Sequence, residues 1–357
     1  MQHEKRGYPN LERLLHTARY VEIDRSCRVV IFSDLHMGDG GRNDEFRHNA
    51  GMLRTILESH YLEQGYSLVL NGDVEELLKF DYESIVKAWS DFYDLFLRFR
   101  KNGFFWKLYG NHDIRLLDLD DYRLAASLVE SLAFQYRGNT LLLYHGHQAS
   151  AFLNGPCSIF SRALFYILRY LAKPAGIRNY SVSYDSRKRF AIEKSVYEFS
   201  NRAKIISIIG HTHRPLFESL SKVDYLDYRI ESLCRTYHST SLKQQALIEK
   251  EIFETRKKLD ACGRKVFRRS LRSGRYGTVV IPSIFNSGCT IGKRGVTALE
   301  IADGMIRLVY WSNGLQCGQP EGERSDRPCE LGSSGYYRAL LNEDLLDYAF
   351  SRIKLLT

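Results

Sequence analysis

Five short motifs of this chain combine histidine, aspartate and asparagine in patterns that could bind metal ions. Each motif directly follows an apolar run, as in IISIIGHTHRP at residues 205–215. Imidazole nitrogens and carboxylate oxygens without a thiolate suit Mn, Fe or Zn in a reactive site better than they suit a structural zinc site. The candidate side chains are Asp34, His36, Asp73, Asn111, His112, Asp113, His145, His147, His211 and His213.

Taken singly, none of these motifs identifies a site. An aspartate such as Asp34 or Asp73 can cap a helix, and an asparagine such as Asn111 can occupy a turn. Two histidines that alternate at a strand end, such as His211 and His213, can bond within their own neighbourhood. A metal site therefore requires a fold that brings the five motifs together.

The segments before the motifs are predicted to be strands of a layered α/β protein, because they are short, apolar and separated by helical patterns. In such a fold the carboxyl ends of the strands open onto a common crevice, so we expect the motifs to meet there. The predicted strands are 28–33, 66–70, 104–109, 141–144 and 205–209, with helices at 52–64 and 82–100.

The candidate ligands are too many for one tetrahedral ion, so two ions are the expected number. A carboxylate such as Asp73 can bridge two ions that lie about 3.5–4 Å apart. Such a pair lowers the pKa of a bridging water, which makes hydroxide available as a nucleophile near neutral pH.

The ordered set Asp-x-His, Gly-Asp, Gly-Asn-His-Asp, His-Gly-His and Gly-His-x-His resembles the calcineurin-like metallophosphoesterase family over residues 28–215. This resemblance implies a two-sheet β-sandwich flanked by helices, an α/β (α+β) fold, in place of a doubly wound sheet. It implies a hydrolase that cleaves a phosphate ester or a pyrophosphate bond by attack of a metal-bridging hydroxide. It also implies that His112 protonates the leaving oxygen or stabilises phosphoryl charge. It implies one ion on Asp34, His36, Asp73 and His213, and a second ion on Asp73, Asn111, His145 and His211, with Mn the first choice and Fe or Zn alternatives.

Other polar residues near the motifs are predicted to support this site. Asp113 is expected to orient the ring of His112, because a working imidazole usually has a partner on its second nitrogen. His147 is expected to lie beside the ligands without binding an ion. Four side chains could bind phosphate oxygens, with a solvated surface position as the alternative for each: Arg42, Asn43, Arg115 and Arg214.

A narrower resemblance is to the UDP-2,3-diacylglucosamine pyrophosphatases, a branch of the same superfamily. The match covers the Asp-Leu-His and Gly-Asp motifs, His145-Gly146 and the run from Gly210 to Pro215. The chain departs from that branch at His112, where the branch usually carries arginine, and at His147, where it carries aspartate. A lipid-precursor pyrophosphatase and a protein or nucleotide phosphatase both remain open. The alternative outside enzymes is a catalytically silent scaffold, against which the complete ligand set argues.

Two basic insertions are predicted within the catalytic core, whose first part covers residues 20–220. A lid-like helical insertion at 149–204 could hold an anionic amphiphile or contact a membrane surface, or its apolar face could pack on the core. A second, basic helical insertion at 231–275 could meet nucleic acid or anionic lipid, but no nucleic-acid module accompanies it, so an exposed, solvated helix is expected. We therefore do not expect nucleic acid to be a partner.

The C-terminal part is predicted to complete the core. Closing strands are expected within 276–312, with Asp303 and Gly304 in a hairpin turn. Residues 313–357 are predicted to contain a loop followed by a C-terminal helix at 336–355.

The formal net charge of +9 favours an anionic partner, such as a phosphorylated small molecule or a lipid-linked or nucleotide substrate. Seven scattered cysteines without a Cys-x-x-Cys pair favour free thiols in a reducing compartment. The sequence has neither a secretory signal pattern nor an apolar run long enough to span a membrane. These features predict a cytoplasmic protein, with any contact to the inner membrane made peripherally through the 149–204 insertion.

Overall fold

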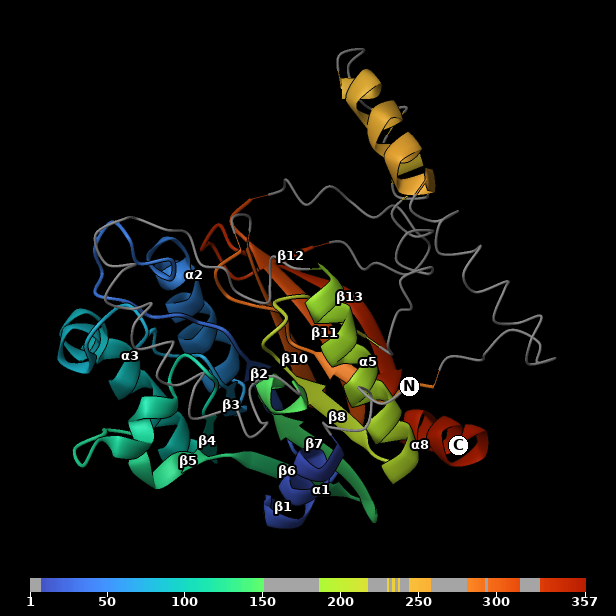
Figure 1. Ribbon diagram of the computed structural model, residues 1–357. Coiled ribbons are helices and arrows are strands. Elements are labelled where there is room, and N and C mark those ends of the chain that lie inside the picture. Colours follow the sequence, from blue (N-terminus) through green and yellow to red (C-terminus); the bar gives the residue numbers. More distant parts are fainter. Residues whose placement is uncertain are drawn as a thin grey trace.

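Two β-sheets face one another and are flanked by helices, as Figure 1 shows for this computed structural model. The structure describes residues 8–150, 186–217, 230, 233–234, 237, 244–257, 281–292, 295–314 and 328–357. The predicted two-sheet α/β architecture is therefore confirmed. Among the described residues, no helix is both long and apolar enough to cross a membrane.

The first sheet has eight strands in the order β12-β13-β11-β10-β2-β3-β4-β5. Its β2 to β5 half is parallel, and its β10 to β13 half is antiparallel. The strands are β2 (Val29–Phe32), β3 (Ser67–Asn71), β4 (Phe105–Leu108), β5 (Leu128–Val129), β10 (Gly295–Ala302), β11 (Met305–Ser312), β12 (Cys329–Glu330) and β13 (Tyr337–Leu345).

The second sheet has five strands in the order β1-β6-β7-β8-β9. Only β6 and β7 pair in the antiparallel sense, and the other neighbours are parallel. The strands are β1 (Arg19–Ile23), β6 (Ser131–Tyr136), β7 (Asn139–Tyr144), β8 (Ile206–Ile209) and β9 (Ile284–Asn286).

Helices cover the outer faces of both sheets (Figure 1). Helix α2 (Arg47–Ile56) continues into the π-helical turn η1 (Leu57–Leu62) and packs with α3 (Tyr82–Asn102) on the eight-stranded sheet. Helices α1 (Tyr8–Thr17) and α5 (Ser186–Ala203) pack on the five-stranded sheet. The short turns are η2 (Ile114–Asp118), η3 (Ala125–Ser127) and η4 (His147–Ala149), and the chain ends in α8 (Leu346–Leu356).

The prediction of a continuous helix over 336–355 is wrong in its first half. Strand β13 pairs with β11 along most of its length, and helix α8 begins only at Leu346. The segment Tyr337–Leu345 contains good helix formers, but pairing with an open sheet edge outweighs that local preference. The hairpin at Asp303 and Gly304 is confirmed, because both residues have positive φ between β10 and β11.

The two predicted insertions are described only in part. Residues 151–185 of the 149–204 insertion lie outside the described residues, and the remainder contains all of α5. Apolar side chains of α5, namely Ile192, Val196 and Phe199, pack on the five-stranded sheet, so this part of the insertion belongs to the core. Within 231–275, residues 244–257 are helical and mainly exposed.

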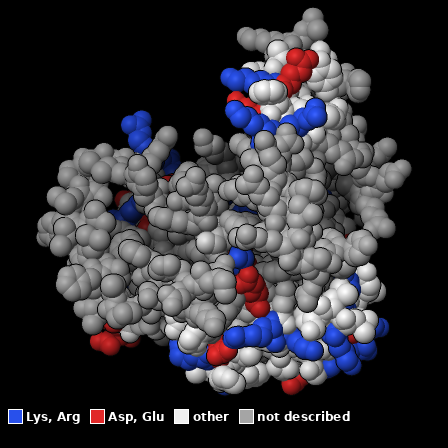
Figure 2. All heavy atoms as spheres, turned by 45° about the vertical axis from the view of Figure 1, so that its right-hand side comes forward, with Lys and Arg blue, Asp and Glu red and all other residues white. Residues whose placement is uncertain are grey.

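Basic side chains on the described surface are often paired with acids. Figure 2 shows Lys and Arg gathered along the lower part of one face, with Asp and Glu among them. Arg13 lies 2.6 Å from Glu130, and both Arg25 and Arg137 contact Asp347. Exposed pairs of this kind contribute little to stability because water and salt screen them. Part of the positive charge on the described surface is therefore locally neutralised.

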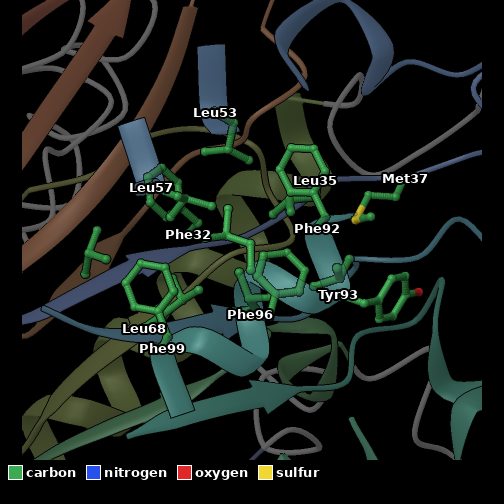
Figure 3. Packing of buried hydrophobic residues seen from close by; sticks show 14 of the residues in the cluster. Phe32, Leu35, Met37, Leu53, Leu57, Leu68, Phe92, Tyr93, Phe96 and Phe99 are labelled. Atoms are coloured by element: carbon green, nitrogen blue, oxygen red, sulfur yellow. The ribbon is translucent and has the colours of Figure 1, made fainter. Parts of the chain in front are cut away.

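The core has layers on both sides of the eight-stranded sheet because successive strand residues point to opposite faces. In β2, Val30 and Phe32 pack under α2 and α3, whereas Val29 and Ile31 face the other sheet. Figure 3 shows Phe32 and Leu68 from the sheet packed against Phe92, Phe96 and Phe99 of α3. Two packed layers hold the strand ends rigidly, which fixes the loops that follow them.

Candidate metal centre

The loops after β2, β3, β4, β7 and β8 meet at the carboxyl ends of the strands, as predicted. Backbone hydrogen bonds join the first two loops, from Asp34 N to Gly72 O at 3.0 Å and from His36 N to Asp73 O at 3.0 Å. His145 follows β7, and its Nε2 lies 3.0 Å from Asp73 Oδ2, so the two sheets contribute to the same site. These side chains are almost completely buried.

Five of the candidate ligands adopt a left-handed backbone conformation, with φ between 50° and 62°. In the described part of the chain, only three other non-glycine residues have positive φ. Each such residue costs on the order of 1–3 kcal/mol and persists only where its surroundings fix it, commonly at functional sites. The strained residues are Asp34, His36, Asp73, His211 and His213.

The first cluster joins Asp34, His36 and His213. The Nε2 atoms of the two histidines lie 3.2 Å apart, and His213 Nε2 lies 3.1 Å from Asp34 Oδ1. His36 Nδ1 lies 2.9 Å from Glu76, a carboxylate that can only accept, so the Nδ1 carries the proton. With Nδ1 as the donor to Glu76, Nε2 of His36 faces the other two atoms and is free to bind a cation, which is the arrangement of a cation site.

The second cluster joins Asp73, His145 and His211. His145 Nδ1 donates to the carbonyl oxygen of Asn71 at 2.9 Å, which leaves Nε2 facing Asp73 Oδ2. Burial lowers the pKa of His145, but Asp73 outweighs burial and raises this pKa to about 9. A proton or a cation between the two atoms relieves their contact. The Nε2 atom of His211 is also buried and makes no hydrogen bond with the described residues.

The glycines of the motifs leave no room for a side chain at this centre. A Cβ on Gly110 would lie 2.1 Å from Asp73 Oδ1, and a Cβ on Gly72 would lie 2.4 Å from His145 Nδ1. A Cβ on Gly210 would meet Asp34 Oδ2 at 2.7 Å. The backbone therefore approaches the ligands as closely as only glycine allows.

Asn111 fits the set of donors predicted for the second ion. Its Oδ1 is buried and makes no hydrogen bond with the described residues. A buried amide oxygen without a donor is costly unless a ligand binds it. Clusters of orphaned acceptors, fixed tautomers and tight glycines together fit divalent cations, and the metal identity stays a prediction.

Glu76 is a site residue that the sequence reasoning missed. Its carboxylate lies 2.9 Å from both His36 Nδ1 and His112 Nδ1, so it orients two rings at once. Burial lowers the pKa of His112, but Glu76 and then Asp73 outweigh burial and raise it to about 10. An acid three residues after Asp73, at the same strand end, is the signal that could have identified Glu76.

Asp113 does not orient His112 as predicted. Its carboxylate instead accepts hydrogen bonds from Lys107 Nζ at 2.7 Å, Val74 N at 2.8 Å and Gly110 N at 2.5 Å. Asp113 thus joins the loop after β3 to the loop after β4. The physical reason is that the buried Lys107 ammonium attracts the carboxylate away from the neutralised His112–Glu76 pair.

His147 lies beside the ligands, where it was expected. Its ring centre is 5.6 Å from that of His145 and 6.2 Å from that of His211. Burial first, and then the His145 ring, lower the pKa of His147 to about 3. His147 is therefore a neutral imidazole at the edge of the second cluster, and its supporting role stays a prediction.

The four predicted phosphate-binding residues have different surroundings. Arg42, Asn43 and Arg115 are exposed on loops that follow the strand ends, and their roles stay predictions. Arg214 instead forms a two-point ion pair with Glu193 of α5. Its guanidinium is therefore directed at the protein rather than presented to solvent.

No protein-family model and no curated protein matches the chain. Among solved structures, a single mutant of Vps29 from Entamoeba histolytica is similar, with a TM-score of 0.31 and 12% sequence identity. The match covers 80% of this chain and 92% of the other. A likeness this slight supports no conclusion about the site.

Proposed function

We propose that the protein is a dinuclear metal-dependent phosphoesterase of the calcineurin-like metallophosphoesterase type. The observation that carries the proposal is a pair of adjacent buried clusters whose nitrogen and oxygen lone pairs face one another. Such contacts are unfavourable unless a proton or a cation lies between the atoms, and a cation would satisfy all of them at once. Asp34, His36 and His213 would hold one ion, and His145, His211 and Asn111 would hold the other, with Asp73 shared between them.

The ions, when bound, would act as Lewis acids on the phosphoryl oxygens and would lower the pKa of a bound water. The residues of the chain position His112 and its proton. Asp73 accepts a hydrogen bond from His112 N at 2.8 Å, so the loop that carries His112 is fixed to the proposed bridging carboxylate. Glu76 holds His112 by Nδ1, which leaves Nε2 directed toward the site at 3.9 Å from Asp73 Oδ2. Nε2 can then donate a proton to the leaving oxygen.

The substrate class that fits this site is a phosphate ester or a pyrophosphate. The site supplies a proton donor in His112 and cation-binding atoms beside it, and attack by a water of lowered pKa would require no phosphoenzyme. A phosphorylated small molecule, or a lipid-linked or nucleotide compound, also agrees with the net charge of +9.

The proposal is tested by hydrolysis assays on metal-stripped protein re-supplied in turn with Mn, Zn, Fe and Mg. p-Nitrophenyl phosphate, bis(p-nitrophenyl) phosphate and a nucleoside diphosphate sugar separate monoesterase, diesterase and pyrophosphatase. We expect metal-dependent turnover of at least one of them. Two tightly bound ions without turnover of any of these compounds would favour the scaffold alternative over the proposed enzyme.

A matched pair of variants sharpens this test. Asp73→Asn should abolish turnover and reduce the metal content, because both ions lose a charged ligand. Asp303→Asn is the control, since Asp303 has the same left-handed backbone but lies exposed in the β10–β11 turn. Metal content is measured by mass spectrometry of the elements after dialysis. Equal metal content and turnover in both variants would contradict the role of Asp73.

A further inference from the structure

The loop after β8 supplies a ligand to each of the two clusters. His211 belongs to the cluster of Asp73 and His145, and His213 belongs to the cluster of Asp34 and His36. Only Thr212 separates the two histidines. The conformation of this one residue therefore determines how far apart the two imidazoles lie.

Thr212 is held from both sides by buried polar groups. Its hydroxyl donates to Glu193 Oε1 at 3.0 Å and accepts from Asn286 Nδ2 at 2.9 Å. The same Asn286 amide also donates to the carbonyl oxygen of Gly210 at 2.9 Å. The hydroxyl thus links α5 to β9 across the loop.

Glu193 also holds the residue that follows the second histidine. Arg214 Nε donates to Glu193 Oε1 at 3.2 Å, and a second guanidinium nitrogen donates to Oε2. Glu193 is buried to all but 6% of its surface on the inner side of α5. One carboxylate therefore contacts the loop on both sides of His213.

Besides neutralising Arg214, these contacts of Glu193 fix the backbone around His213. His211 and His213 both have positive φ, a conformation that relaxes unless neighbouring groups fix it. The contacts of Glu193 to Thr212 and Arg214 surround the strained His213, and Asn286 fixes the loop from the other side.

We propose that Glu193 is a positioning residue that sets the spacing of His211 and His213 and thereby the geometry of both metal sites. Helix α5, which carries Glu193, is the first described element after residues 151–185. The inference rests on the proposed function only in that the two clusters bind divalent ions.

The test is a titration of the metal-stripped full chain with Co²⁺, followed by calorimetry and by the visible absorption spectrum of the bound ion. Glu193→Ala should weaken both binding events by about 10–100-fold, the usual effect of losing a partner that orients ligands. It should also shift the Co²⁺ absorption bands. Glu198→Gln, a change on the same helix at a side chain that is 40% exposed, is the control and should leave both readouts unchanged.

Rescue by a conservative variant separates positioning from simple stability. Glu193→Gln retains an acceptor for Thr212 but loses the ion pair with Arg214, so its Co²⁺ affinity should lie between wild type and Glu193→Ala. Thr212→Val preserves the shape of the side chain and removes the hydroxyl that donates a hydrogen bond to Glu193. It should reduce the affinity for both ions without altering Glu193 itself.

A double-mutant cycle of Glu193→Gln and Thr212→Val gives the decisive result. If the two groups act through one contact, the losses of affinity combine to less than the product of the single effects. Wild-type Co²⁺ affinity and spectrum in folded Glu193→Ala or in Thr212→Val would overturn the inference. If Glu193→Ala does not fold, the result for Thr212→Val alone tests it. Failure of the wild-type chain to bind Co²⁺ would instead overturn the proposed function.

Discussion

At the scale of single residues, the partner of each histidine Nδ1 atom decides whether the Nε2 atom of the same ring faces a cluster. His36 and His145 both give Nδ1 to an acceptor, so their Nε2 atoms point into the clusters. His112 is fixed in the same way by Glu76 but lies beside the clusters rather than within one of the two proposed ion sites. The same residue type therefore has two different functions, set by its neighbours.

His112→Ala should separate proton transfer from metal binding. The variant should retain the metal content of the wild-type chain, because the proposed ligands are all present. Its turnover should fall by about 10²–10⁴-fold if His112 is the general acid. Metal analysis and the hydrolysis rate of a substrate with a poor leaving group, measured on the same samples, check both parts.

A substrate with a good leaving group provides the internal control. p-Nitrophenolate needs little protonation, so the loss for its ester should be smaller than for an alkyl ester. An equal loss for both esters, or full activity with either, would mean that His112 does not act as the acid. His48→Ala, an exposed histidine outside the clusters, should behave like wild type.

The motifs in the sequence predicted which side chains form the clusters, but the sequence did not predict their hydrogen-bond partners. The motifs identified the side chains of both clusters because glycine, aspartate and histidine recur at strand ends. They did not identify Glu76 as the partner of His112 or Glu193 as the partner of Arg214, because hydrogen-bond pairing depends on side-chain direction and on elements distant in sequence. Asp113 was misassigned for the same reason, since its cation, Lys107, lies inside a strand.

At the scale of elements, the ends of the strands were predicted better than the edges of the sheets. The run at 28–33 forms β2 and the run at 66–70 forms β3, because buried parallel strands are apolar throughout. Strand β13 was missed because its residues are half-exposed or exposed and show no clear period of two. Its pairing with β11 is decided by an open edge that the sequence of 337–345 does not reveal.

Strand β4 contains a buried cation that connects two of the site loops. Lys107 is fully buried, with Nζ 2.9 Å from Glu75 Oε2 and 2.7 Å from Asp113 Oδ2. Burial lowers the pKa of Lys107, but Asp113 and Glu75 outweigh burial and raise it, so the ammonium stays charged. Tyr93 and Tyr122 donate to the other oxygen of Glu75. The loops after β3 and β4 are thereby linked beneath the metal centre.

Lys107→Met should therefore destabilise the fold, because two buried carboxylates would face each other without a cation. The expected loss is about 3–5 kcal/mol in the free energy of unfolding, the usual effect of removing one partner of a buried ion pair. Urea denaturation followed by circular dichroism measures it. Lys101→Met, at the exposed end of α3, is the control and should change the free energy by about 0.5 kcal/mol or less.

A second substitution in the same cluster checks the cause. Glu75→Gln in the Lys107→Met background removes one of the two unpaired charges, so it should recover part of the lost stability. No recovery, or a loss for Lys107→Met as small as for Lys101→Met, would show that the charge cluster is not what holds the two loops together.

At the scale of the whole molecule, the fold keeps its most unfavourable local structure in one place. The five strained candidate ligands follow strands of both sheets. Leu35 and Met37, which flank His36, belong to the same core cluster as the aromatic side chains of α3 (Figure 3). In the absence of an ion, the facing lone pairs of the clusters and the left-handed backbone conformations both raise the free energy of the native state. Metal binding should therefore stabilise the entire chain rather than only the loops.

The size of this effect follows from linkage. A ligand that binds only the native state at 100 times its Kd adds about 2.7 kcal/mol to the free energy of unfolding. For a domain of this length, the entropy of unfolding converts that into roughly 3–4 °C in Tm for each ion. Saturation of both clusters with Mn²⁺ should therefore raise Tm by about 7 °C, and a chelator should reverse the shift. Asp73→Asn should show little of it, because the carboxylate proposed to serve both ions is gone, whereas equal shifts in wild type and Asp73→Asn would place the bound metal somewhere other than the two clusters.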